Sequence, residues 1–94
     1  MKQAMKISYY GSLREHTGET GFAWETPAAS LGDLLNALSD RYGEGFRALV
    51  LSGGELSPGI TALINGRDAR QLGGLAAPLA PGDSVFLLPL AGGG

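Results

Sequence analysis

The sequence predicts a small α+β domain built in two layers, with a sheet of four or five strands and one main helix packed on one face. Two observations lead to this fold class. Residues 30–42 are the segment in which apolar residues recur at a sustained helical spacing. Short β-branched or aromatic runs that end at glycine or proline lie before and after it. Because a single helix can cover only one face of a sheet, these elements pack most simply as two layers.

Length and composition agree with one folded domain. The chain has 94 residues, of which 44% are hydrophobic and 17% charged, as in folded soluble proteins. The chain has seven Lys and Arg residues and nine Asp and Glu residues, and the basic residues form no stripe along the sequence. Nucleic acid is therefore not an expected partner. No apolar run approaches the roughly 20 residues of a membrane span, and the N-terminus lacks the apolar core of a signal peptide. We therefore expect a cytoplasmic protein with no membrane partner.

The elements before the helix form a predicted hairpin. Met5 is a second possible start, and residues 1–4 are given no structural role. Residues 5–10 are rich in β-branched and aromatic side chains and read as a first strand, which Gly11 ends. Residues 13–18 make a short connection with a helical turn. Residues 21–26 alternate through Phe22 and Trp24 and predict a second strand, closed by Pro27.

The helix is the clearest element. Its apolar residues fall on one stripe at i, i+3, i+4, i+7 and i+11, and they are Leu31, Leu34, Leu35, Leu38 and Tyr42. Ser30 is a suitable N-cap, Asp33 complements the positive end of the helix, and Gly43 supplies the stop. An amphipathic helix over residues 30–42 follows.

The second half of the chain supplies the other strands. Residues 46–51 add a short piece that is either helical or extended, and residues 52–59 are a loop rich in turn residues. Residues 60–64 predict a strand, and Asn65-Gly66 favours a type I′ turn into a short returning strand over residues 67–70. After a Gly/Ala/Leu segment and a turn at residues 81–83, residues 84–88 form the last strand.

The last strand is apolar on both faces, but the single helix can cover only one of them. If one set faces the helix, a second set lies on the opposite face of the sheet beside the end of the chain. The first set is Ile7, Tyr9, Val85 and Leu87, and the second is Tyr10, Phe86 and Leu88. An apolar patch of this kind marks a partner site, and the alternative is that the second strand or a loop covers it.

The side chains offer little chemistry of their own. The chain has no cysteine, and its single histidine, His16, lies in a predicted loop without a partner constellation for catalysis or metal binding. The glycine pairs do not match a phosphate-binding fingerprint. We therefore expect a protein that is not itself an enzyme and that holds no metal or cofactor.

The C-terminal carboxylate is the reactive group that the sequence does offer. The last strand runs into Pro89, Leu90 and Ala91 and then into Gly92, Gly93 and Gly94. A glycine backbone can thread a channel too narrow for side chains, whereas the alternative is a frayed chain end. A carboxylate is a poor electrophile, so an ATP-using partner would have to convert it into an acyl-adenylate and shield that anhydride from water. The chain would then be a substrate carried on a folded handle.

Four motifs stand out in the sequence. They are residues 6–15 (KISYYGSLRE), residues 30–34 (SLGDL), Ile64-Asn65-Gly66, and the run from Gly82-Asp83 to the terminal glycines. Together they resemble the MoaD/ThiS family of ubiquitin-like sulfur carriers. The resemblance implies a β-grasp fold over residues 5–90 and a flexible tail over residues 91–94. It also implies that an E1-like enzyme adenylates Gly94 and that a sulfur donor converts it to a thiocarboxylate, with Gly92 and Gly93 threading into the partner.

Several acceptors are compatible with this resemblance. The chain length and the segment over residues 71–83 look like the small subunit of molybdopterin synthase, which implies docking of Tyr10, Phe86 and Leu88 on a large catalytic subunit. His16-Thr17-Gly18 and residues 72–76 resemble carriers that serve cysteine biosynthesis instead. A thiamine carrier and a ubiquitin-like protein modifier are further alternatives. The third glycine exceeds the family's usual pair, so either Gly93 or Gly94 is the reactive end.

Overall fold

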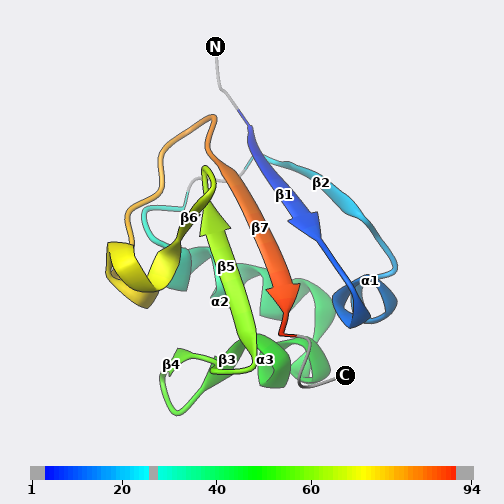
Figure 1. Cartoon of the computed structure of the whole chain (residues 1–94). Coiled ribbons are helices and arrows are strands. Elements are labelled where there is room, and N and C mark those ends of the chain that lie inside the picture. Colours follow the sequence, from blue (N-terminus) through cyan, green and yellow to red (C-terminus); the bar gives the residue numbers. More distant parts are fainter. Residues whose placement is uncertain (1–3, 26–27, 91–94) are drawn as a thin grey trace.

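The computed structural model describes residues 4–25 and 28–90 and confirms the predicted two-layer α+β architecture (Figure 1). A five-stranded mixed sheet has the strand order β2-β1-β7-β5-β6. Helices α2 (Leu31–Tyr42) and α3 (Glu44–Val50) lie behind this sheet in the view of Figure 1. The strands of the sheet are β1 (Met5–Tyr9), β2 (Gly21–Trp24), β5 (Ile60–Ile64), β6 (Arg67–Asp68) and β7 (Ser84–Pro89).

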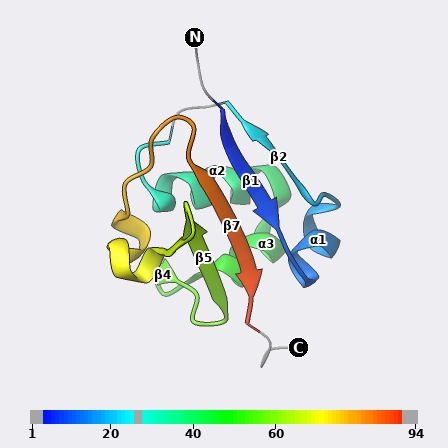
Figure 2. The same cartoon turned by 45° about the horizontal axis from the view of Figure 1, so that its top comes forward.

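The last strand lies at the centre of the sheet. β7 pairs in parallel with β1, with Ile7 opposite Val85, and antiparallel with β5, with Ala62 opposite Leu87 (Figure 2). β2 and β6 pair antiparallel with their sequence neighbours β1 and β5. The turn between β5 and β6 has positive φ at both Asn65 (53°) and Gly66 (83°), as the predicted type I′ turn requires.

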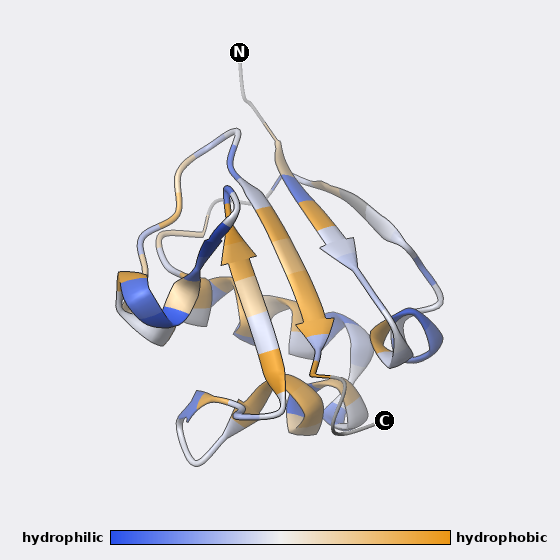
Figure 3. Ribbon diagram, in the orientation of Figure 1, coloured by the Kyte–Doolittle hydropathy of each residue, from blue (hydrophilic) through white to orange (hydrophobic). Residues whose placement is uncertain are grey.

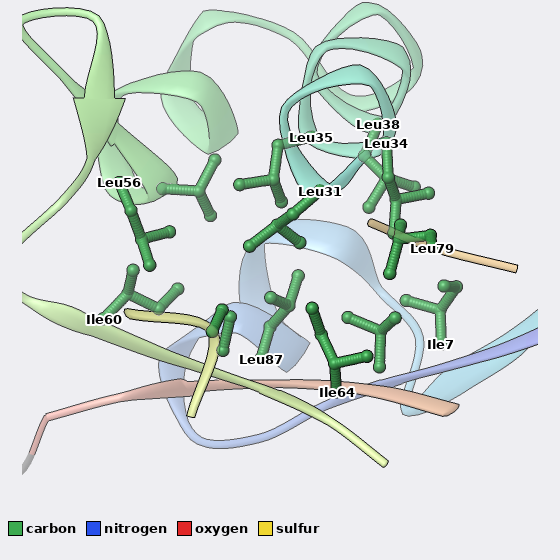
Figure 4. Close-up of a cluster of buried hydrophobic side chains, with 14 of the residues drawn as sticks. Ile7, Leu31, Leu34, Leu35, Leu38, Leu56, Ile60, Ile64, Leu79 and Leu87 are labelled. Carbon is green, nitrogen blue, oxygen red and sulfur yellow. The ribbon is translucent and has the colours of Figure 1, made fainter. Parts of the chain in front are cut away.

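The main helix buries the predicted stripe against the sheet. α2 (Leu31–Tyr42) begins after Ser30, whose Oγ accepts a hydrogen bond from the N–H of Asp33 at 3.2 Å, so the predicted N-cap is confirmed. Leucines from α2 point toward Ile7, Ile64 and Leu87 of the sheet (Figure 4). The set predicted to face the helix, Ile7, Tyr9, Val85 and Leu87, is fully buried.

The structure adds elements that the sequence left open or missed. α1 (Ser12–Thr17) is the predicted helical connection, and residues 44–50 form a helix, α3 (Glu44–Val50). The segment predicted as a loop over residues 52–59 contains part of a small hairpin of β3 (Leu51–Ser52) and β4 (Glu55–Leu56). Two short 3₁₀ helices, η1 (Ala69–Leu72) and η2 (Gly74–Ala76), follow β6, so the returning strand ends two residues earlier than predicted.

A polar cluster joins the two layers. The hydroxyl of Tyr9, a residue with 0% exposure, donates to the hydroxyl of Tyr42 on α2 at 3.0 Å. The Tyr42 hydroxyl donates in turn to the Glu19 carboxylate at 2.5 Å, and Arg41 lies 3.6 Å from the same carboxylate. Burial raises the pKa of both tyrosines, so both are neutral hydrogen-bond donors at physiological pH.

Candidate functional site

The point at which the chain leaves the sheet is defined by a backbone hydrogen bond. Pro89 ends β7 opposite Ile60, and the next residue, Leu90, donates its N–H to the carbonyl of Gly59 at 2.9 Å. Ala91 and the predicted reactive residues Gly92, Gly93 and Gly94 lie outside the described residues. Since an extended chain spans about 3.5 Å per residue, the four residues from Ala91 to Gly94 can reach at most about 14 Å beyond Leu90.

The predicted apolar face lies on the side of the sheet away from α2 and α3. Phe86 sits between Ser8 of β1 and Leu63 of β5, and its ring centroid is 5.7 Å from that of Tyr10. Tyr10, Phe86 and Leu88 are all half-buried, in contrast to the fully buried Val85 and Leu87. Figure 3 looks onto this face, where β7 is hydrophobic along most of its length. The structure therefore brings the three predicted residues together at the end of the sheet from which the tail departs.

Two residues of this face were not identified from the sequence. Leu63 is half-buried beside Phe86, and its alternation with the buried Ala62 and Ile64 was a signal that could have placed it there. Arg14, on α1, donates from Nε to the carbonyl of Tyr9 at 2.8 Å. Its guanidinium carbon lies 5.0 Å from the centroid of the Tyr10 ring. The face is thus apolar with a cation at its margin, and only the fold reveals that cation.

A groove of about 480 Å³ adjoins the root of the tail. Its lining includes Tyr10, Gly11, Ala48, Leu88, Pro89 and Leu90. Gly11 has φ 58°, and a Cβ at this position would lie 3.3 Å from Cγ of Pro89. Glycine at this position therefore keeps the turn after β1 close to the chain as it leaves β7.

The remaining candidate groups do not form a reactive site. His16 lies on α1 with its ring beside Gly45 of α3. Within residues 4–25 and 28–90, no group of three or more His, Asp and Glu side chains could hold a metal ion. No helix in this part of the chain is long and apolar enough to cross a membrane. The geometry supports docking and presentation of the chain end.

Comparison with known proteins decides the family. The model of the ThiS family matches residues 7–94. The chain belongs to the ThiS family. Small archaeal modifier protein 3 of Haloferax volcanii is 31% identical over 91 residues, covering 96% of this chain and 98% of that protein. Sulfur carrier protein CysO of Mycobacterium tuberculosis is 34% identical over 84 residues, covering 87% of this chain and 89% of that protein.

A solved structure extends the likeness to the fold. The crystal structure of the Amycolatopsis orientalis BexX/CysO complex contains a chain that is 30% identical, with a TM-score of 0.83 over 97% of this chain and all of that one. The predicted β-grasp fold and the resemblance to MoaD/ThiS carriers are confirmed. As a ThiS-family protein, the chain is a ubiquitin-like carrier or modifier that acts as a protein co-substrate and not as an enzyme.

Proposed function

We propose that this protein carries sulfur as a thiocarboxylate on Gly94. The observation that carries the proposal is the hydrogen bond that anchors Leu90 to Gly59, immediately before Ala91 and the three glycines in the sequence. A fixed root followed by residues almost without side chains suits insertion of the chain end into the active site of another protein. Family membership supports the same role, because relatives include a protein named as a sulfur carrier.

The chemistry requires two partners and no catalytic residue from this chain. An E1-like enzyme binds ATP, and a carboxylate oxygen of Gly94 attacks the α-phosphorus and displaces pyrophosphate. A sulfur donor then delivers sulfur at the oxidation level of sulfide, which attacks the carbonyl carbon and expels AMP. The product is a thiocarboxylate, and the glycines at positions 92 and 93 occupy the channel that excludes water during both steps.

The proposed acceptor is the large subunit of molybdopterin synthase. The apolar face of Tyr10, Leu63, Phe86 and Leu88 ends at the root of the tail, so one partner can cover the face while it receives the chain end. Docking on this face supplies apolar burial for affinity and sets the direction in which the tail enters. The same face would meet the E1-like enzyme at a different time.

Two other roles are each favoured by one relative. The match to Sulfur carrier protein CysO favours a carrier for cysteine biosynthesis, and the match to Small archaeal modifier protein 3 favours a modifier joined to lysines. A carrier of thiamine biosynthesis also belongs to this set. These roles share the activated terminus and differ in the acceptor.

Mass spectrometry tests the common step. The purified chain, incubated with its E1-like partner, ATP and a sulfur donor, is expected to show one oxygen replaced by sulfur at the C-terminus. A variant that ends at Gly92 serves as the control, because it keeps the whole described domain and lacks the last two residues. An unchanged mass for the full chain would contradict the proposal.

The thiocarboxylate form is then offered separately to molybdopterin synthase and to a cysteine synthase, and isopeptide adducts are sought in cells.

A further inference from the structure

Arg70 lies in η1, twenty residues before Leu90, the last described residue before the tail. Its side chain forms hydrogen bonds with the turn at the start of β5. Nη1 donates to the carbonyl of Ile60 at 2.8 Å, and Nη2 donates to the carbonyl of Ser57 at 2.6 Å. The planar guanidinium can satisfy both carbonyls at once because its donors form a rigid fork. Arg70 therefore bridges the two ends of residues 57–60.

The turn that Arg70 holds is also the turn to which the tail is tied. Within it, the N–H of Ile60 donates to the carbonyl of Ser57 at 3.2 Å, and the N–H of Gly59 donates to Oγ of Ser57 at 3.2 Å. The carbonyl of Gly59 accepts the N–H of Leu90 at 2.9 Å. A continuous set of hydrogen bonds thus runs from Arg70 through residues 57–60 to Leu90.

We propose that Arg70 is a positioning residue for the reactive terminus. By holding residues 57–60 it keeps Leu90 bound to Gly59, and this bond determines where the tail leaves the domain and how far Gly94 can reach. The proposal rests on the proposed function, since reach matters only if the terminus reacts inside a partner.

Release of the root has a calculable effect on the tail. With Leu90 bound, four residues follow it and reach about 14 Å when extended. If the turn shifts and Leu90 is released, the free segment gains one residue and about 3.5 Å. The released segment also has more conformations to lose when a partner binds it. Docking should therefore weaken, while the chemistry of a tail that has entered the partner should stay the same.

The test compares Arg70→Gln with Arg67→Gln. Both substitutions remove one positive charge, and Arg67 of β6 makes no side-chain hydrogen bond or ion pair within the described part of the chain. Hydrogen exchange of the Leu90 amide in the full chain is measured first by NMR. Exchange is expected to be about tenfold faster in Arg70→Gln than in Arg67→Gln, and intermediate in Arg70→Lys, since an ammonium lacks the fork.

Steady-state adenylation with the E1-like partner follows. Arg70→Gln is expected to raise KM about threefold to tenfold with kcat within about twofold, because uniform binding is lost and the chemical step is retained. Arg67→Gln should match the unmodified chain. Thermal unfolding of both variants is recorded, so that a general loss of stability is separated from a change at the root.

The shortest tail that still reacts is a measurement that would not change if Arg70 had only a general structural role. A series ending at Gly94, Gly93 or Gly92 is assayed in each background. In the Arg70→Gln background the shortest tail that still reacts is expected to be one residue shorter, because release of Leu90 restores the lost reach. The proposed role of Arg70 would be overturned if the Leu90 amide exchanged equally fast in the two glutamine variants. It would also be overturned if both variants reacted with the same set of tail lengths. If the unmodified chain is not adenylated, the proposed function fails. The exchange measurement still decides whether Arg70 keeps Leu90 bound to Gly59.

Discussion

The hydrogen bonds of Tyr9 and Tyr42 predict an unequal response to removal of either hydroxyl. In Tyr42→Phe the Tyr9 hydroxyl loses the acceptor at 3.0 Å in a residue with 0% exposure, and Glu19 loses the donor at 2.5 Å. In Tyr9→Phe the bond between the two tyrosines is removed, and Tyr42 keeps its bond to Glu19. The first substitution should therefore be the more destabilising.

The magnitudes follow from the kind and exposure of each bond. The neutral bond between the hydroxyls contributes about 0.5–1.5 kcal/mol, and a buried polar group that loses its partner costs about 1–3 kcal/mol. The bond to the Glu19 carboxylate belongs at the low end for a charged acceptor, because the Glu19 side chain is 34% exposed and can be rehydrated. We expect a loss of about 2–3 kcal/mol for Tyr42→Phe and about 1 kcal/mol for Tyr9→Phe.

The double variant makes the test decisive. Each single substitution removes the bond between the two hydroxyls, so the sum of the single losses counts this bond twice. The loss of unfolding free energy in the double variant should therefore be about 1 kcal/mol smaller than that sum. Urea denaturation of the four proteins gives these free energies, provided that the slope with denaturant is unchanged. Equal losses for the two single variants, or strictly additive losses in the double variant, would refute the reasoning.

Three further predictions concern pH, docking and backbone geometry. Burial raises the pKa of Tyr9 and Tyr42, so above about pH 10 the unfolded chain loses protons that the folded chain keeps. The free energy of unfolding should fall by up to about 1.4 kcal/mol per pH unit for Tyr9 and by less for Tyr42, because the half-buried Tyr42 is partly screened by solvent. Tyr9→Phe should therefore show a shallower fall in urea titrations between about pH 10 and 12; equal slopes would count against it. Phe86→Ser should lower the unfolding temperature, because it removes a half-buried ring beside Tyr10, and below that temperature it should weaken binding to the E1-like partner at least about tenfold by calorimetry. Ser84→Ala on the same face should do neither. Gly21→Ala would bring a Cβ against the carbonyl of Ile7 and should destabilise the fold by more than about 2 kcal/mol, whereas Gly45→Ala in α3, where the space is ordinary, should not destabilise it; similar unfolding curves for the two alanine variants would contradict this.

Local periodicity explains why the helix and most strands were predictable. The stripe from Leu31 to Leu38 repeats every three or four residues, which suits only an α-helix, and Ser30 and Gly43 marked its ends. The two faces of β7 followed from the alternation of side chains along a strand. Once the helix was assigned to one face, the placement of Phe86 and Leu88 on the opposite face followed from this alternation alone. The sequence predicted an exposed patch there, whereas in the structure both side chains are half-buried.

Predictions were weaker where the local pattern had two readings. Residues 44–50 are too few for a helical period to exclude an extended segment, and packing of Phe46 and Val50 into the core selects the helix. The hairpin of β3 and β4 consists of two short strands around Gly53-Gly54, which from sequence is indistinguishable from an irregular loop. In both places contacts with the core decide the conformation.

The sequence by itself determined the family, the two-layer fold class and the residues of the apolar face, and it predicts the reactive group at the terminus, because each depends on residue order along short stretches. Tertiary structure alone decided which distant residues meet. Pairing of β1 with β7 places Tyr10 beside Phe86, and η1 brings Arg70 to the turn that holds Leu90. These contacts join residues far apart in the chain, and no local spacing encodes them. The proposed site of reaction thus follows from the last residues of the sequence, whereas the position from which they would reach a partner depends on the whole fold.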